Sequence, residues 1–202
     1  AATEQGANNS EVCVTPGRPL IMARSDQHGV AVLFRPRCKL WARPTCAEIN
    51  RRLWIAKVGY GAGELLKSED NLTMITLTSH PRLTVAGSRR VFADAWPKLR
   101  RRVQRRQRDF AYVMIPERQK NGRIHVHALS NGHLGTTFWK NHGAACGLGW
   151  RNEEEPCRSL WRAAYYANKY LSKETAATQW PKGFRRVRTS RNWPKLPPHA
   201  AP

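Results

Sequence analysis

The amino-acid sequence predicts a protein of the α+β class, in which antiparallel strands are combined with amphipathic helices. Residues 71–79 alternate in polarity and are rich in β-branched side chains, which is typical of a strand. Residues 110–115 and 123–129 also have strand-like patterns, and the Asn-Gly pair in the turn between them is a hairpin signal, so these two strands should be antiparallel neighbours. The segments 88–108 and 159–173 have helical character instead.

The chain is short and strongly basic. Its 202 residues are enough for one hydrophobic core and a small appendage. It has 35 Lys and Arg residues against 14 Asp and Glu residues, a formal net charge of +21. Such an excess points to a polyanionic partner, usually nucleic acid. No apolar run is long enough to span a membrane, and the first residues do not resemble a signal peptide, so we expect a cytoplasmic protein with no membrane partner.

Changes in composition divide the chain into four segments. Residues 1–20 are polar and mixed, and are expected to form a mobile N-terminal arm. Residues 21–67 form an accessory segment with a short strand, a helix and a glycine-containing flexible connection. Residues 68–178 contain the main predicted strands and helices. Residues 179–202 are basic and rich in proline, and we expect an irregular tail there.

The five cysteines do not suggest a disulfide framework, because their number is odd and the chain is expected to be cytoplasmic. Cys38 and Cys46 are eight residues apart, whereas structural zinc sites usually have paired ligands two to four residues apart. Arg43 stands where such a pair with Cys46 would need a cysteine. Buried, unreactive thiols are the favoured interpretation, and a partial zinc site is the alternative.

The predicted helix at residues 88–108 has a densely cationic face. Its apolar residues recur at spacings of three and four, and Asp94 is its only acid before Arg108. Solvated helix faces normally mix both signs of charge, so we interpret this face as a phosphate-binding surface. Pro97 interrupts the segment and is expected to begin a second helix. The predicted contacts with nucleic acid are Arg89, Arg90, Arg100, Arg101, Arg102 and Arg105.

Two histidines share one face of the strand at residues 123–129. Successive strand residues point to opposite faces, so His125 and His127 project together. Two imidazoles at this spacing can hold one metal ion, although they could also be solvated side chains of a half-buried strand. The hairpin could bring the Glu117 carboxylate beside them, which would leave metal positions open for substrate oxygens. Alternatively, Glu117 is an ordinary turn carboxylate paired with a neighbouring cation.

The last predicted helix carries a stripe of four residues at i, i+3, i+4 and i+7, which are Tyr166, Lys169, Tyr170 and Lys173. Aromatic residues at this spacing usually belong to a core, but two lysines in the same stripe do not fit a core. Tyrosine has a pKa near 10 and is a poor nucleophile by itself. A metal that withdraws charge from a phosphodiester, together with a lysine, would help a tyrosine to attack and form a covalent phosphotyrosine.

Three segments, in this order, resemble the three motifs of the HUH-endonuclease superfamily, in particular those of rolling-circle replication initiators. Residues 75–80 (ITLTSH) resemble the first motif, an apolar strand with two threonines. Residues 123–129 (RIHVHAL) resemble the histidine–hydrophobic–histidine strand, and residues 165–173 (YYANKYLSK) resemble the tyrosine helix. The Tyr166-x-x-x-Tyr170 spacing is similar to the two-tyrosine form found in initiators of small single-stranded DNA phages.

The resemblance implies a fold and a cofactor. The fold is an antiparallel sheet with helices packed on it, in a ferredoxin- or RRM-like arrangement, within residues 68–178. The cofactor is Mg²⁺ or Mn²⁺, held by His125, His127 and a third polar ligand, for which Glu117 is the best-matching position.

The resemblance also implies a reaction at a replication origin in single-stranded DNA. Tyr166 would cut one strand, stay joined to the 5′ phosphate and leave a free 3′ hydroxyl, while Lys169 offsets negative charge. Tyr170 would perform the next transfer, which closes the displaced strand into a circle. Tyr165 is the alternative nucleophile, but Lys169, three residues after Tyr166, favours Tyr166.

The sequence also departs from this pattern. Residues 38–48 resemble a cysteine cluster that related proteins carry before the first motif, but Arg43 replaces its middle cysteine. No glycine-rich phosphate-binding loop with a lysine is present, so a helicase as well as a polymerase would be supplied in trans in the host cytoplasm. The alternative function is a non-catalytic DNA- or RNA-binding protein on the same fold, and a related transposase or relaxase is a third possibility.

Overall fold

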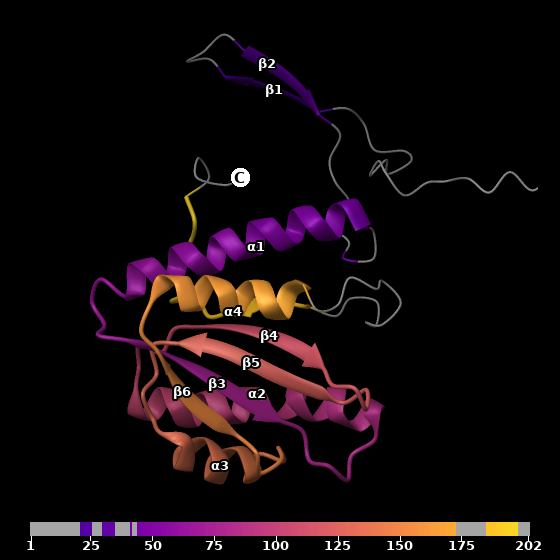
Figure 1. Ribbon diagram of the computed structural model, residues 1–202, viewed down its shortest axis with the longest axis vertical. Helices are drawn as coiled ribbons and strands as arrows, with labels where there is room; N and C mark the ends of the chain where they lie inside the picture. The colour runs from indigo at the N-terminus through magenta and orange to yellow at the C-terminus, as the bar shows by residue number, and fades with distance from the viewer. Residues whose placement is uncertain (1–20, 26–29, 35–40, 42–43, 173–184, 198–202) are drawn as a thin grey trace, which may run out of the picture.

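Figure 1 shows the computed structural model, which describes residues 21–25, 30–34, 41, 44–172 and 185–197. The predicted N-terminal arm at residues 1–20 lies outside the described residues, as do Cys38 and Lys173. Within the described part of the chain, no helix combines the length and the apolar character needed to cross a membrane.

A five-stranded antiparallel sheet forms the centre of the molecule (Figure 1). Its strands lie side by side in the order β6 (Glu153–Cys157), β3 (Leu72–Thr78), β5 (Ile124–Ser130), β4 (Tyr112–Arg118) and β7 (Arg188–Thr189). The predicted hairpin is the β4–β5 pair, and Gly122 in its turn has a φ of 80°, a conformation that glycine adopts readily. The α+β fold and the antiparallel sheet are therefore confirmed.

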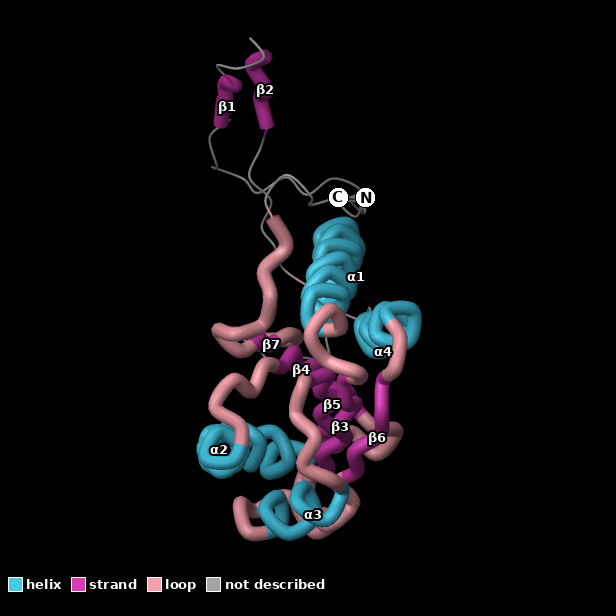
Figure 2. Tube along the Cα trace, turned by 90° about the vertical axis from the view of Figure 1, so that its left-hand side faces the viewer, coloured by secondary structure: helices cyan, strands magenta, loops and turns pink. Residues whose placement is uncertain are grey.

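Helices cover both faces of the sheet, as Figure 2 shows. One layer consists of α2 (Val85–Arg106) and α3 (Thr136–Ala144), and the other consists of α1 (Pro44–Leu65) and α4 (Leu160–Ser172). Because strand side chains alternate between faces, each layer encloses its own hydrophobic core. A separate antiparallel hairpin is formed by β1 (Ile21–Ser25) and β2 (Val30–Phe34).

The three glycines expected to form a flexible connection instead lie within α1, so this expectation is wrong. Gly61 is buried against the indole of Trp193, and a side chain there would collide with that ring. The Trp193 Nε1–H also donates to the Lys57 carbonyl at 3.4 Å. The glycine therefore serves close packing, which outweighs the modest cost of a glycine in a helix.

Helix α2 is continuous, so the expectation of a second helix beginning at Pro97 is wrong. The Thr84 hydroxyl accepts a hydrogen bond from the Gly87 N–H at 3.0 Å and caps the helix start. Pro97 and Ala93, whose carbonyl loses its helical partner, are both exposed. Water can therefore satisfy that carbonyl, and the apolar stripe of α2 holds the helix on the sheet.

Two segments join the sheet that the sequence did not predict as strands. Residues 153–157 form the edge strand β6, and residues 188–189 of the expected irregular tail form β7 at the opposite edge. The buried Trp193 anchors this tail segment to α1. Strand β4 also extends further than expected, so Glu117 lies in the strand rather than in the turn.

Candidate functional site

The predicted polar ligands meet on the sheet face that α1 and α4 cover. In the β4–β5 register Glu117 lies opposite His125, while Thr76 of β3 lies opposite His127. The Glu117 Oε2 atom is 2.7 Å from His127 Nε2, and Thr76 Oγ1 is 3.2 Å from His127 Nδ1. The structure therefore holds the buried His127 ring between a carboxylate and a hydroxyl.

These contacts determine the proton positions on the His127 ring. An ionised carboxylate can only accept, so the bond to Glu117 requires a proton on Nε2. In the neutral ring Nδ1 then accepts from the Thr76 hydroxyl. A cation in place of the Nε2 proton would be bound by Nε2 and by the Glu117 oxygen, and Nδ1–H could then donate to Thr76, as metal-bound histidines usually do.

His125 lies on the open side of this arrangement. Its ring centroid is 6.1 Å from that of His127, and the ring is partly buried. Burial lowers the pKa of His125 below its usual value, and the neighbouring His127 acts in the same direction. His125 is thus kept neutral, which is the protonation state that a metal ligand needs. Among the described residues, however, no group of three or more His, Cys, Asp or Glu side chains is arranged as a metal site.

Both predicted tyrosines of α4 contact His127. The Tyr170 ring stacks on the imidazole with centroids 3.8 Å apart and an interplanar angle of 20°. The Tyr166 ring meets it edge-on at 6.1 Å, and the two tyrosine rings are 4.7 Å apart. The i, i+4 spacing places the two phenols next to each other, and it places both against the strand that carries the histidines.

The Tyr166 hydroxyl is unusual. The residue is 6% exposed, and its oxygen is buried with no hydrogen-bond partner among the described residues. Burial raises the pKa of Tyr166 well above 10, and neighbouring Tyr170 adds to the shift. Burial also raises the pKa of Tyr170 to about 12, and Glu117 contributes to this shift. Both phenols therefore stay protonated near neutral pH, and a buried hydroxyl without a partner marks a place where a polar group is missing.

The neighbouring residues of α4 separate in direction. The Lys169 Nζ atom lies 5.2 Å from the Tyr170 ring centroid, so its charge is close to the site. Tyr165 instead is 55% exposed and stacks on Trp161 with ring centroids 5.5 Å apart. Tyr165, the alternative nucleophile, consequently points away from His127.

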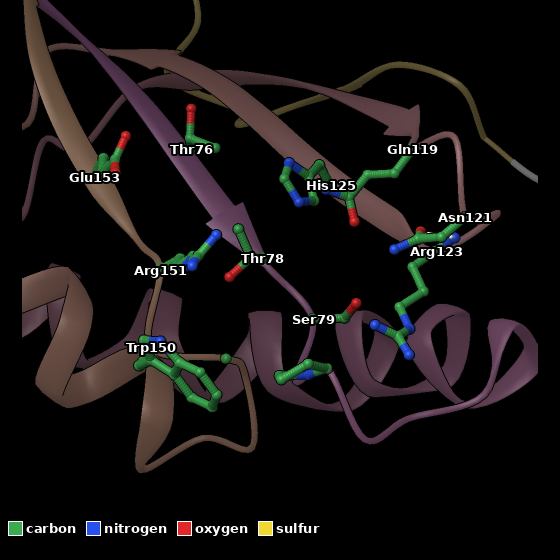
Figure 3. Close-up of a pocket in the computed structure, with 12 residues that line it drawn as sticks. Thr76, Thr78, Ser79, Gln119, Asn121, Arg123, His125, Trp150, Arg151 and Glu153 are labelled. Atoms are coloured by element: carbon green, nitrogen blue, oxygen red, sulfur yellow. Dashed lines mark hydrogen bonds between the residues drawn. The ribbon is translucent and has the colours of Figure 1, made fainter.

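A pocket of about 390 Å³ opens beside His125 (Figure 3). Its wall includes Thr76 and Thr78 of β3, the β4–β5 turn with Arg123, and the segment from Gly149 to Glu153 that leads into β6. Trp150 is 54% exposed at its rim, and His80 contacts the indole edge-on at 5.3 Å. The Gly149 N–H donates to the Thr78 carbonyl at 2.8 Å, which fixes this segment against β3.

Sequence reasoning missed several of these groups. Thr76 was noted only as part of a motif, and its contact with His127 depends on the β3–β5 register. Trp150 and Arg151 come from a loop without any periodic signal, so their place at the pocket could not be read from spacing. The acidic run at residues 153–155 was the one available signal for β6, but such runs usually occur in solvent-exposed loops.

The basic residues predicted to bind nucleic acid do not join this site. Helix α2 packs on the opposite face of the sheet from α4 (Figure 2), so its cationic face is remote from the tyrosines. Arg90, Arg101 and Arg105 are exposed there, and Arg89, Arg100 and Arg102 are partly buried. Lys173 lies outside the described residues. The nucleic-acid contacts of all these residues stay a prediction.

Comparison with known proteins supports the interpretation of the site. The model of a family of replication-associated proteins, the ORF2 type, matches residues 72–175, which contain the histidines and the tyrosines. No curated protein and no solved structure matches the chain. Since the family match spans half of the chain, the protein belongs to this family of ORF2-type replication-associated proteins.

Proposed function

We propose that this protein is a two-tyrosine HUH endonuclease that nicks and rejoins single-stranded DNA to initiate and terminate rolling-circle replication. The observation that carries the proposal is the contact of both α4 tyrosines with His127, which also binds Glu117. A nucleophile, a second nucleophile and a set of metal-ligand groups thereby come together from three elements of a replication-associated protein.

We assign Mg²⁺ or Mn²⁺ to the place between Glu117, His127 and His125. The donor set fits such an ion, because a neutral imidazole and a carboxylate oxygen already face each other at 2.7 Å. The buried Tyr166 hydroxyl, which has no partner among the described residues, points to a missing polar group at the same place. When bound, the ion withdraws electron density from the phosphodiester and makes its phosphorus more open to attack.

Tyr166 is assigned as the first nucleophile. Its oxygen would form a bond to phosphorus as the bond from phosphorus to the 3′ oxygen breaks. The phenol proton balances the alkoxide that leaves as a 3′ hydroxyl, and the 5′ phosphate stays on the tyrosine. The raised pKa of Tyr166 means that attack depends on the charge that surrounds the phosphate, so the nucleophile is inactive until substrate enters.

Tyr170 is assigned the second transfer. Its ring is 4.7 Å from that of Tyr166, so one α4 helix presents two phenols to the same phosphate position. It would cut the junction that replication regenerates, and the free 3′ hydroxyl would attack the first phosphotyrosine to close the displaced strand. Lys169, beside the Tyr170 ring, is placed to offset negative charge on the phosphate.

The pocket beside His125 is assigned to the DNA strand that flanks the cut phosphate. Trp150 offers an exposed aromatic face for one base, and Arg123 and Arg151 supply positive charge. An unpaired strand can lay its bases into such a pocket, whereas a duplex keeps its bases stacked inside. The protein would therefore act on single-stranded DNA, and a helicase and a polymerase would come from other chains.

The decisive experiment incubates the full chain with mixed single-stranded DNA and Mn²⁺, followed by mass mapping of any nucleotide-bearing peptide. We expect an adduct on Tyr166, no adduct when EDTA is present, and loss of that adduct in Tyr166→Phe. Tyr165→Phe is the matched control, since Tyr165 is adjacent in sequence but points away from His127. If no strand is cut with Mg²⁺ or Mn²⁺ across a diverse pool, the catalytic assignment fails.

A second candidate function is non-catalytic nucleic-acid binding on the same fold. The deep burial of Tyr166 favours it, because a core tyrosine can serve packing alone. In that case Tyr166→Phe would leave DNA binding unchanged, and no covalent adduct would form under any metal condition. The adduct experiment therefore decides between the two functions.

A further inference from the structure

A large open cleft lies at the β7 edge of the sheet and is lined by residues of both helix layers. Its volume is about 800 Å³. Strand β7 is only two residues long and pairs with Val113 and Met114 alone, so it leaves the space between α1 and α2 uncovered. In Figure 2 β7 lies at the edge of the sheet, between these two helices. The shortness of the edge strand thus creates the cleft.

The described residues that line the cleft carry positive charge from two directions. Arg100 comes from α2, and Arg185, Arg186 and Arg188 come from the segment around β7. None of the described lining residues is acidic. The Arg100 Nε atom is buried and has no hydrogen-bond partner among the described residues. Four guanidinium groups around one space repel one another, and an anion placed between them would remove that cost.

Aromatic side chains complete the lining. Trp41 and Trp54 are both partly exposed, and Trp54 belongs to α1 on the other layer from Arg100. The Arg186 guanidinium lies 4.6 Å from the Trp41 ring centroid, which fixes the orientation of that indole. Alternating cations and accessible indoles are the combination that single-stranded nucleic acids use, with phosphates on the cations and bases on the rings.

The cleft is separate from the proposed catalytic site. It adjoins the part of β4 near Tyr112, whereas Glu117 lies near the other end of that strand. The pocket beside His125 is lined from β3 and the approach to β6, on the opposite side of the sheet order. A smaller apolar pocket lined by Arg89, Arg185 and Arg188 continues the basic surface along α2.

We propose that this cleft, which we call the β7 cleft, binds a second stretch of single-stranded DNA away from the site of cutting. Phosphates would contact the four arginines, and unpaired bases would stack on Trp41 and Trp54. This assignment rests on the cleft's own residues and holds whether or not the tyrosines cut DNA. It would give the cationic surface of α2 a ligand that the catalytic face cannot reach.

The first experiment measures affinity of the full chain for a labelled 30-nucleotide oligothymidine in EDTA, so that no cutting intervenes. The variant Arg185→Ala/Arg188→Ala removes two exposed cations of the cleft. The control Arg108→Ala/Lys140→Ala removes two exposed cations elsewhere and gives the same net charge. We expect the cleft variant to bind roughly tenfold more weakly, with the slope of log K against log salt smaller by about 1.4, and the control to change far less.

The second experiment tests stacking. Trp41→Ala should weaken binding of the same oligonucleotide at least about fivefold, by the usual contribution of one stacked base. Trp161→Ala is the control, because Trp161 is 73% exposed on α4 and lies outside the cleft. Thermal unfolding of both variants separates a lost contact from a lost fold, and the quenching of tryptophan fluorescence by the oligonucleotide should decrease only in Trp41→Ala.

Several outcomes would overturn the proposal. Equal losses in the cleft and control variants would mean that DNA senses only the total charge. A loss confined to duplex DNA would mean that the cleft takes a double helix instead. Adduct formation on a short oligonucleotide that spans only the cut site provides the separation from catalysis. It should be unchanged in the cleft variant, so a failure of the cleft assignment and a failure of the nicking assignment give different results.

Discussion

The two faces of the central sheet solve opposite problems with the same strand. Toward α2 and α3, β5 presents Ile124, Val126 and Ala128, which join a closed apolar core. Toward α4 it presents His125 and His127, which face tyrosines and a carboxylate. The α2 face is packed for stability, whereas the α4 face includes a buried hydroxyl without a partner among the described residues. A rigid apolar face thus allows the other to keep polar groups in place at a cost in stability.

The largest expected effect is on activity at the α4 face. His127→Ala should lower the rate of covalent adduct formation at least ~1,000-fold, because it removes one proposed metal ligand and the surface against which both tyrosines lie. The measurement is adduct yield against time with Mn²⁺. His133→Ala is the control, since His133 is exposed and lies outside the site. Comparable rates for His127→Ala and the native protein would contradict the assignment.

The next effect concerns stability at the α2 face. Leu99→Ala should lower the free energy of unfolding by about 2–5 kcal/mol, because Leu99 is fully buried and its removal leaves a cavity. Urea unfolding measures this, and Leu160→Ala, half exposed on α4, should cost less than about 1 kcal/mol. The adduct rate per folded molecule should not change. A strong loss of that rate would show that the two faces are coupled.

Alkaline pH should distinguish the faces by a smaller amount. Folding raises the pKa of Tyr166, so the folded protein holds a proton that the unfolded chain releases above about pH 10. Stability from this group is complete below that pH and falls as pH rises, by up to about 1.4 kcal/mol per pH unit. Tyr166→Phe should therefore lose less stability than the native protein between pH 9 and 11. Parallel curves would mean that the phenol is solvated.

The smallest effect is that of Tyr166→Phe at neutral pH. Removing a buried hydroxyl that lacks a partner among the described residues should leave the free energy of unfolding unchanged or raise it by up to about 1 kcal/mol. Thermal unfolding of the variant and of Tyr165→Phe provides the comparison. A clear destabilisation would show that the hydroxyl makes a hydrogen bond in solution, and the idea of a polar group missing beside it would then be lost.

The sequence was sufficient to predict what depends on local periodicity. Alternation predicted β3, the Asn-Gly turn predicted the β4–β5 hairpin, and helical spacing predicted α4 with both tyrosines on one stripe. It was less informative where tertiary contact decides. Gly61 lies inside α1 because Trp193, more than a hundred residues later, packs against its bare backbone. The acidic strand β6 forms because β3 offers it an open edge.

The same division applies to the site. His125, His127 and Glu117 could be grouped from strand alternation and a hairpin, and the structure brings Glu117 to His127. The partner hydroxyl of Thr76 and the opposite directions of Tyr165 and Tyr166 depend on strand register and helix rotation. The placement of α2 behind the sheet likewise could not be predicted from its charge pattern.

The contact between Gly61 and Trp193 also has a consequence for how the protein can be shortened. The segment that resembles known replication proteins begins at residue 72 and ends at residue 175, yet α1 and Trp193 lie outside it. Within the folded chain, Val58 and Ala62 of α1 share one core with Ala163 and Ala167 of α4. A fragment trimmed to the family boundaries would expose the back of the tyrosine helix to water. The smallest autonomous folding unit therefore extends beyond the recognisable family segment at both ends.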